Sequence, residues 1–435
     1  MKRRGKLTLL QLAAATYLMV SGGPYGMEEL VQDCGYPAAL AILILIPVIW
    51  SLPVGLMVGE LSAAIPAEGG FYIWVRKAMG PFWGFQEAWL SLTASIFDMA
   101  AYPTLFVLSL GRLWPPAAQG ANGIWIGVAF VSACLVWNLF GARAVGEGSL
   151  VLGALLLSPF VVIVTLALVR HAAAGNGAAA APIHTDWLAG ILVAMWNYMG
   201  WDNASTVAGE VENPQRTYPR VMLLAVAAVT LSYVIPVVTV WRAGVPRGSW
   251  ATGSWVSISG LLAGSWLGVA LLVATMISTL GSFNSLTLSL SRLPLAMAQE
   301  GYAPRVFRWT LSNGVPWVAV TVCGIAWMAA LQLSFDRLLM LDILLYGVSL
   351  ILEFVALIKL RIREPKMPRP FAIPGGIGAL VLLGTGPAVL LVAAAIKSRD
   401  EQLGSVSAFA VGLAIMAAGV VAYWVAEWRR RATAV

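Results

Sequence analysis

A succession of long apolar segments, each the length of a membrane-spanning helix, is the feature that most constrains this chain. The chain has 435 residues, of which 60% are hydrophobic and 11% are charged, and its mean hydropathy is +0.83. A helix needs about 20 apolar residues to cross the hydrocarbon core of a bilayer. The sequence therefore predicts an all-α polytopic membrane protein surrounded by the lipid bilayer. We expect about twelve transmembrane helices, over residues 8–32, 38–63, 82–113, 122–141, 149–170, 187–210, 219–242, 262–291, 315–333, 337–360, 377–396 and 405–427.

Two of these segments contain residues that interrupt a helix. The first holds Ser21-Gly22-Gly23-Pro24, and the sixth holds Met199-Gly200-Trp201-Asp202. Glycine permits dihedrals that other residues avoid, and proline lacks a backbone donor. Backbone groups freed inside a membrane are tolerated only where protein or a water-filled cavity satisfies them. Two broken helices, one in each half of a chain, are typical of the midplane binding site of a secondary transporter.

The chain also shows a weak internal symmetry. The break at Gly22-Gly23 recurs at Gly200, and the opening of the third helix, Met79–Gly84, is similar to that of the eighth, Ala263–Gly268. The two offsets are similar, which predicts that helices 1–5 and 6–10 are copies of one unit. Because five is odd, the second copy must be inverted in the membrane, as in many transporters. We expect a first repeat over residues 1–170, an inverted second repeat over 171–360, and two additional helices over 361–435.

The positive charge of the chain is explained by its orientation in the membrane. The net charge is +7. If the N-terminus is cytoplasmic, most of the 27 Lys and Arg residues fall on the cytoplasmic side, as the positive-inside rule requires. This pattern predicts a protein of the inner membrane with both termini in the cytoplasm, and it makes a nucleic-acid partner unnecessary. Lys2–Lys6 precede the first helix without a small-residue cleavage site, which indicates a helix and not a signal peptide.

Several acidic residues lie within the predicted spans. Asp202 follows the second break, Asp98 lies deep in the third helix, and Glu28 and Glu29 follow the first break. A carboxylate at the bilayer centre costs about 2.5–3.5 kcal/mol even on lenient scales. Acids outnumber bases in this interior, which favours a cationic substrate, a metal cation or coupling protons.

Other groups beside the breaks are suited to holding a substrate. Trp196 and Gly200 are four residues apart and share one helix face. An indole there can cover an organic cation, and Trp201 could form a second lid. The amide groups that follow the first break are a potential site for a carboxylate or another anionic group. In helix 8, hydroxyls such as Ser278 and Ser282 could ligate Na⁺, or they could form ordinary helix–helix hydrogen bonds.

Glu60, Glu210 and Arg216 differ from this set because they lie near the cytoplasmic ends of helices. With Arg76 and Arg292 nearby in the predicted topology, they indicate ion pairs of a gate or scaffold.

The sequence holds no P-loop, no metal-ligand cluster and no nucleophile–base arrangement. Its three cysteines, Cys34, Cys134 and Cys323, have no metal or redox spacing. These observations argue against an enzyme and against a bound metal or cofactor. Transport would have to be driven by a gradient, with H⁺ or Na⁺ as the coupling ion.

Five motifs together resemble the amino acid–polyamine–organocation superfamily over nearly the whole chain. They are Glu60-Leu61 with Pro66 and Gly69-Gly70; Gly80-Pro81-Phe82-Trp83; Gly200–Pro219 with its ending ENPQRTYP; Ala296-Met297-Ala298 with Gly301; and Arg363-Glu364-Pro365 with Arg369-Pro370. The first break with Glu28, and Asp98 with Ala101-Tyr102-Pro103, are most similar to its polyamine-uptake and L-type amino acid transporter-like branch. The resemblance implies a LeuT-type fold, with a 5+5 inverted repeat and broken helices 1 and 6.

The resemblance also implies a set of site residues. Trp196 matches an aromatic residue that stacks on substrate in amine antiporters of the family, and Asp202 matches an acidic position after the helix 6 break. The helix 1 break matches the segment that holds a substrate carboxylate in amino acid carriers. Helix 8 departs from the plant polyamine branch at Ser285–Leu288, where acidic and serine residues are usual. The expected substrate site comprises Ser21, Gly22, Gly23, Pro24, Glu28, Asp98, Tyr102, Trp196, Gly200, Trp201, Asp202, Ser278 and Ser282, and the expected gate Glu60, Glu210 and Arg216.

These observations predict a secondary active transporter that moves a cationic amine, polyamine or amino acid by alternating access, coupled to an ion. One alternative is a neutral amino acid carrier or exchanger, in which Asp98 and Asp202 serve coupling alone. Another is a membrane nutrient sensor that binds without transporting.

Overall fold

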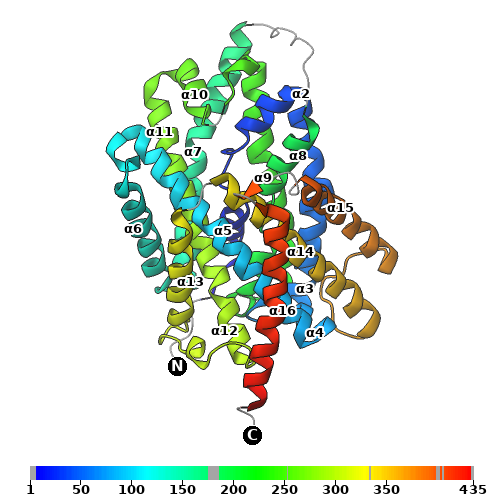
Figure 1. Ribbon diagram of the computed structural model, residues 1–435. Helices are drawn as coiled ribbons and strands as arrows, with labels where there is room; N and C mark the ends of the chain where they lie inside the picture. The colour runs from blue at the N-terminus through cyan, green and yellow to red at the C-terminus, as the bar shows by residue number, and fades with distance from the viewer. Residues whose placement is uncertain are drawn as a thin grey trace.

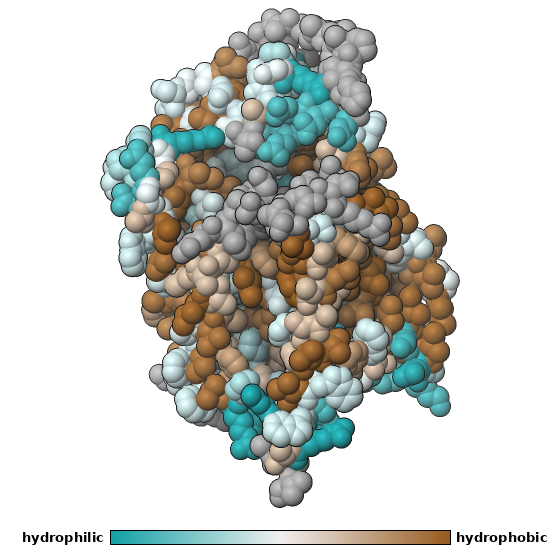
Figure 2. All heavy atoms as spheres, viewed as in Figure 1, coloured by the Kyte–Doolittle hydropathy of each residue, from teal (hydrophilic) through white to brown (hydrophobic). Residues whose placement is uncertain are grey.

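The computed structural model describes residues 6–174, 186–251, 253–332, 335–397, 402–403 and 406–432, and the chain is mostly helical in these ranges. In them, nine helices are long and apolar enough to cross a membrane. Hydrophobic side chains form a broad band between two polar ends of the molecule (Figure 2). The expected all-α polytopic membrane fold is therefore confirmed. The basic residues before Lys6, which contribute to the predicted orientation, lie outside the described residues.

The first half of the chain contains one broken helix and four long transmembrane segments. Its elements are α1 (Leu9–Val20), α2 (Glu28–Ile46), the π-helix η1 (Pro47–Ser51), α3 (Leu52–Ala64), α4 (Gly70–Met79), α5 (Pro81–Leu113), the 3₁₀-helix η2 (Pro115–Ala118), α6 (Ala121–Asn138) and α7 (Ala142–Ala174).

The second half repeats the pattern of a broken helix followed by long helices. Its elements are α8 (Trp187–Asn197), η3 (Trp201–Thr206), η4 (Ala208–Glu210), α9 (Pro214–Arg242), η5 (Arg247–Ser249), α10 (Trp255–Ala263), α11 (Ser265–Leu290), α12 (Arg292–Gln299), η6 (Arg305–Arg308), α13 (Trp317–Ala329), η7 (Ala330–Gln332) and α14 (Phe335–Arg363). Then follow α15 (Gly376–Lys397), the paired strands β1 (Gln402–Leu403) and β2 (Val406–Ser407), and α16 (Ala408–Ala432).

The first expected break lies where the glycines and proline are. Helix α1 starts at a capping box formed by Thr8 and Gln11, an arrangement that satisfies two orphan backbone donors. It ends at Val20, and helical structure resumes at Glu28. A second kink follows within α2, where Gly35 has a φ of 73°. The span expected over residues 8–32 is thus two short helices joined by an open segment.

The second expected break is also present, but the chain after it differs from the prediction. Helix α8 ends at Asn197, and Gly200 has a φ of 93°. Residues up to 210 then form the 3₁₀-helices η3 and η4, so the regular helix expected there is wrong. Side chains replace the missing helical donors: the Tyr218 hydroxyl donates to the Ala204 carbonyl at 2.6 Å.

The helices pack around α1, which lies near the centre of the molecule (Figure 1). Helix α5 packs on α11 and α14, α2 packs on α8, and α3 packs on α9. The Leu7 amide donates to the Glu210 carbonyl at 2.8 Å, which ties the start of α1 to the end of the other broken helix. The last residues of α16 lie at the end of the molecule that also holds α4 and α12 (Figure 1).

Candidate functional site

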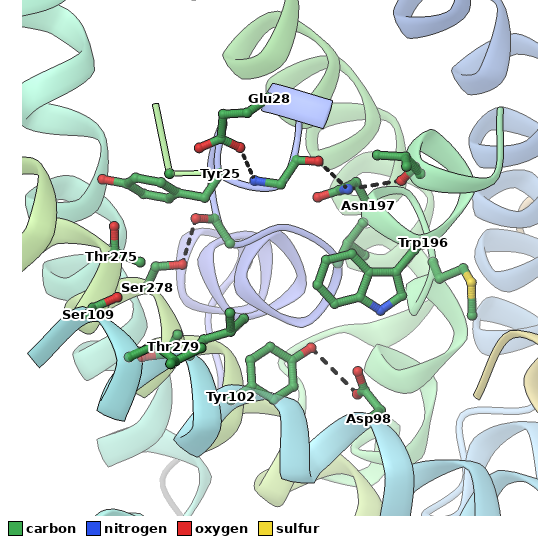
Figure 3. A pocket seen from close by; sticks show the side chains of 18 of the residues that line it. Tyr25, Glu28, Asp98, Tyr102, Ser109, Trp196, Asn197, Thr275, Ser278 and Thr279 are labelled. Carbon is green, nitrogen blue, oxygen red and sulfur yellow. Dashed lines mark hydrogen bonds between the residues drawn. The ribbon is translucent and has the colours of Figure 1, made fainter. Parts of the chain in front are cut away.

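A cavity of about 270 Å³ lies between the two helix breaks. Its walls come from both breaks and from α5, α8, α11 and α14. Figure 3 shows how its polar and aromatic side chains face one another. Of the expected site residues, Gly22, Glu28, Asp98, Tyr102, Trp196, Gly200 and Ser278 line the cavity, whereas Ser21, Gly23, Pro24, Trp201, Asp202 and Ser282 do not.

The first break is shaped by hydrogen bonds from neighbouring helices. The Gly22 carbonyl accepts from the Ser278 hydroxyl at 2.6 Å. Ser21 Oγ accepts from the Gly23 amide at 3.0 Å and from the Tyr233 hydroxyl at 2.7 Å. The Pro24 carbonyl accepts from the Trp255 indole at 2.8 Å. Ser21, Gly23 and Pro24 therefore hold the open segment in place behind the cavity wall.

An internal carboxylate occupies the start of α2. The Glu28 side chain is buried, with 3% of its surface exposed, and Oε2 accepts from the Gly26 amide at 2.7 Å. The sequence predicted that amide groups here would receive an external anion. In the structure, the chain itself supplies an anion at this position.

At the second break, a tyrosine connects the backbone to Asp202. The Gly200 amide donates to Tyr346 Oη at 3.0 Å, and the Tyr346 hydroxyl donates to Asp202 Oδ1. Tyr346 lines the cavity, whereas Asp202 is buried behind it. Asp202 thus supports the wall, where the sequence predicted direct contact with substrate.

Trp201 does not fit its predicted position as a lid. Its side chain is fully buried, and its indole donates to the Tyr198 carbonyl at 2.8 Å. Trp196, by contrast, is partly exposed and faces the cavity (Figure 3). The difference follows from the break itself, because the unwound backbone at Tyr198–Gly200 turns the next side chain into the core.

The cavity carries an excess of negative charge. Among the described residues, four carboxylates line it (Glu28, Glu29, Asp98 and Asp342) with a single guanidinium, Arg112. The Tyr102 hydroxyl donates to Asp98 Oδ2 at 3.5 Å, and Arg112 donates to the Gly253 carbonyl at 3.3 Å. In Figure 3, Glu28 and Asp98 lie on opposite sides of the cavity, with aromatic side chains between them.

The hydroxyls of α11 serve the backbone. Thr275 donates to the Leu271 carbonyl and Thr279 to the Met276 carbonyl, both at 2.9 Å, and Ser278 reaches the first break. Ser282 is buried away from the cavity, and its hydroxyl has no hydrogen-bond partner among the described residues. Within the same ranges, no group of three or more His, Cys, Asp or Glu is arranged to hold a metal ion.

Two of the three expected gate residues form ion pairs. Glu210 pairs with Arg292 at 3.0 Å, and both side chains are buried. Glu60 pairs with Arg361 at 2.6 Å and Arg369 at 3.4 Å, partners that the sequence did not indicate. Arg216 is exposed at the start of α9, and no ion pair joins it to a described carboxylate. Its predicted part in a gate is therefore not supported by its position.

Several residues of the cavity wall were not predicted from the sequence. Tyr25 and Asn197 stand beside the breaks, and Asp342 and Tyr346 come from α14. Asp342 could have been found, because it is an acid within the predicted span over residues 337–360. Tyr346 gave no such signal, since its role depends on its contact with Gly200.

Two broken helices around a central, negatively charged cavity in a polytopic α-helical protein define a class: secondary transporters of the membrane. Comparison with known proteins agrees. The family model described as "Amino acid permease" matches residues 7–421, and the chain belongs to this family of membrane transporters. The resemblance drawn from the motifs is thereby confirmed, as is the prediction that the protein is a transporter and not an enzyme.

Named relatives cover most of the chain. It is 32% identical to Polyamine transporter RMV1 of Arabidopsis thaliana, over 94% of this chain and 84% of that protein. It is also 32% identical to Polyamine transporter PUT1 of Oryza sativa subsp. japonica, over 95% of this chain and 78% of that protein. A bacterial relative, Uncharacterized transporter MT2055 of Mycobacterium tuberculosis, is 28% identical over 84% of this chain and 78% of that protein.

Proposed function

We propose that the protein carries linear diamines or polyamines, cations that lack a carboxylate, across the inner membrane by alternating access. In this proposal both termini are cytoplasmic. The expected helices 1, 2, 6 and 7, which come from both of the expected repeats over residues 1–170 and 171–360, move against helices 3, 4, 8 and 9 around the cavity. The names of the plant relatives support this substrate class. The observation that carries it is the position of Glu28.

Glu28 opposes the binding of a substrate carboxylate. The amide groups at the start of a helix are a favourable place for an anion, but the Gly26 amide already donates to Glu28 at 2.7 Å. A substrate carboxylate placed beside this one would meet a like charge. At about 4 Å, two unit charges interact by about 4 kcal/mol at an effective dielectric constant of 20. An amine without a carboxylate avoids this repulsion, and its ammonium group is attracted to Glu28.

The rest of the cavity suits the other end of such a substrate. Asp98 and Asp342 supply negative charge from α5 and α14. Trp196, Tyr25 and Tyr102 present aromatic rings between the acidic ends (Figure 3). A cation over such a ring gains about 0.5–2 kcal/mol, depending on its desolvation. A linear chain with an ammonium group at each end matches two acidic ends joined by an aromatic wall.

Competition between matched compounds tests the substrate class. Uptake of labelled putrescine is measured in proteoliposomes that contain the purified protein, with one competitor added at a time. The competitors form two pairs: agmatine and arginine, and cadaverine and lysine. Each pair differs only by the α-carboxylate. We expect the amine of each pair to inhibit about tenfold more strongly, a difference of about 1.4 kcal/mol. Equal or stronger inhibition by the amino acids, or by neutral amino acids such as leucine, would favour an amino acid carrier.

The variant Glu28→Gln tests whether the Glu28 carboxylate sets the preference for amines. Removing the charge should weaken the inhibition of labelled putrescine uptake by unlabelled putrescine. It should also bring the ratio of inhibition by agmatine to inhibition by arginine close to one. Glu147→Gln is the matched control, because Glu147 is an exposed residue of α7 that pairs with Arg143 on its own helix. An unchanged ratio in Glu28→Gln would show that another group sets the preference.

A further inference from the structure

A stripe of acidic and hydroxyl groups runs along the contact between α5 and α14, away from the cavity. On α14, Asp342, Tyr346, Ser349 and Glu353 follow one another at spacings of four, three and four residues, which places them on one helix face. On α5, Glu87, Ser91, Asp98 and Tyr102 form a similar stripe. The two helices pack against each other. The stripes begin at the cavity with Asp98 and Asp342 and continue into the buried interior.

The acids of the two stripes interact across this contact. Asp342 is within electrostatic range of Asp98, and Glu353 is within range of Glu87. Asp202, on η3, is within range of Glu87, Asp342 and Glu353. Asp202 also accepts a hydrogen bond from Tyr346 of the cavity wall. It therefore connects this wall to Glu87 and Glu353, which form the deeper pair of acids.

The deeper pair is buried and incompletely bonded. Glu87 and Glu353 have no exposed surface. Both carboxylate oxygens of Glu353, and Oε2 of Glu87, have no hydrogen-bond partner among the described residues. The other oxygen of Glu87 accepts from the Ser91 hydroxyl at 2.9 Å. Three buried acceptor atoms therefore lack a donor.

The charged groups on the surrounding helices are engaged elsewhere. On α4, Arg76 pairs with Glu300 and Lys77 with Glu364, and the Tyr72 hydroxyl is near Glu87. Glu60 of α3 pairs with Arg361 of α14 itself, and Glu427 of α16 pairs with Arg430 and Arg431. In the described part of α15, the sequence has no charged residue before Lys397. The groups that face Glu353 are thus Glu87 and Asp202, with Tyr346 beside them.

We propose that Glu87 and Glu353 hold the coupling proton, at a site separate from the substrate cavity. Moving a charged carboxylate out of water costs several kcal/mol, and no cation offsets that cost here. A proton shared by the two side chains removes one charge and supplies an O–H donor to an unpartnered oxygen. It would enter as H⁺ at Asp98 and Asp342, pass the Tyr346–Asp202 contact, rest between Glu87 and Glu353, and leave as H⁺ to the cytoplasm. This inference rests on the proposed amine transport, whose own failure can be detected separately.

The test compares two modes of transport in the same proteoliposomes. Counterflow exchanges labelled putrescine for internal putrescine without a gradient, so it needs the cavity and alternating access only. Gradient-driven accumulation of labelled putrescine under an imposed pH difference needs proton coupling as well. Each preparation of Glu353→Gln, Glu87→Gln and the control Glu147→Gln is scored by the ratio of accumulation to counterflow, which cancels differences in folding yield.

We expect this ratio to fall at least about tenfold in both Glu353→Gln and Glu87→Gln and to remain at the wild-type value in Glu147→Gln. A wild-type ratio in both variants overturns the proposed site. Loss of both modes in properly folded variants also overturns it, because the residues would then be structural. Accumulation driven by a Na⁺ gradient and indifferent to pH excludes a proton. Absence of counterflow in the wild type would instead refute putrescine transport, and so the proposed function.

Discussion

At the scale of single residues, Tyr346 joins three parts of the site. Its ring lines the cavity, its oxygen accepts from the Gly200 amide, and its hydroxyl donates to Asp202. Removing the hydroxyl leaves a buried amide and a buried carboxylate without this partner. An unsatisfied buried group costs about 1–3 kcal/mol, and more when it is charged. We expect Tyr346→Phe to lower the free energy of unfolding by at least about 2 kcal/mol, measured by denaturant titration in detergent.

Tyr72→Phe is the matched control for this substitution. Tyr72 is also buried, but its hydroxyl has no hydrogen-bond partner among the described residues. Removing the Tyr72 hydroxyl should leave the free energy of unfolding unchanged or raise it slightly. If Tyr346→Phe is no more destabilised than Tyr72→Phe, the hydroxyl does not hold the break.

The sequence identified individual acids better than it identified their partners. Asp98 and Glu28 could be selected because a carboxylate within a span is costly. Asp342 and Glu353 carry the same signal, but what they face depends on how α14 packs against α5. Asp202 and Trp201 illustrate the converse, because their place beside a break suggested the cavity, whereas the turn of the backbone directs them into the core.

At the scale of elements, both breaks were predictable and the form of the chain beyond them was not. Glycine and proline weaken the interior of a helix, so the sequence indicated where breaks could lie. Single prolines are nevertheless accommodated within continuous helices, as Pro103 is in α5 and Pro236 in α9. The 3₁₀-helices after Gly200 depend on donors from other helices, such as the Tyr218 hydroxyl of α9 and the Ser289 hydroxyl of α11. The sequence could not show that these donors would be in place.

Gly200 should be required at the second break for two reasons. Its φ of 93° is one that other residues rarely adopt, and an added Cβ would lie 2.8 Å from the Met19 carbonyl oxygen of α1. We expect Gly200→Ala to abolish counterflow of labelled putrescine and to lower stability by more than the ~1–2 kcal/mol of a left-handed conformation alone. Gly244→Ala is the control, since Gly244 has a φ of 78° but open space around it. Similar effects in both variants would show that the approach of α1 to Gly200 is unimportant.

At the scale of the whole molecule, composition predicted a polytopic α-helical membrane protein, and the structure has this class of fold. The even number of spans that the charge bias indicated stays a prediction. Neither composition nor charge bias could predict which helices meet. The close contact between α5 and α14 joins segments about 250 residues apart, and the ion pairs at the α4 and α12 end also join distant segments. Glu60 illustrates this, because its partners Arg361 and Arg369 come from the far end of the chain.

The buried pair of Glu210 and Arg292 connects η4 to α12. In the proposed orientation, it should hold the cytoplasmic side of the cavity closed. Removing one partner of a buried ion pair costs about 3–5 kcal/mol, because the other charge is left uncompensated. Arg292 is already incompletely bonded, since its Nη2 has no hydrogen-bond partner among the described residues. Glu210→Gln should therefore favour the state open to the cytoplasm, in which Arg292 is hydrated.

This shift can be measured with a cysteine introduced as Ser109→Cys, because Ser109 of α5 lines the cavity. The buried cysteines Cys34, Cys134 and Cys323 are first replaced by alanine. With Ser109→Cys as the reporter, Glu210→Gln should slow labelling by an impermeant maleimide from the external side at least about tenfold, the effect of 1.4 kcal/mol on a population. Adding Arg292→Gln removes the uncompensated charge and should restore much of the rate. The control Glu147→Gln removes an exposed pair on one helix. Because such surface pairs contribute little, this variant should have little effect. Equal labelling in all of these proteins would mean that the buried pair does not bias the two states, and that closure rests on the packing of η4 against its neighbours.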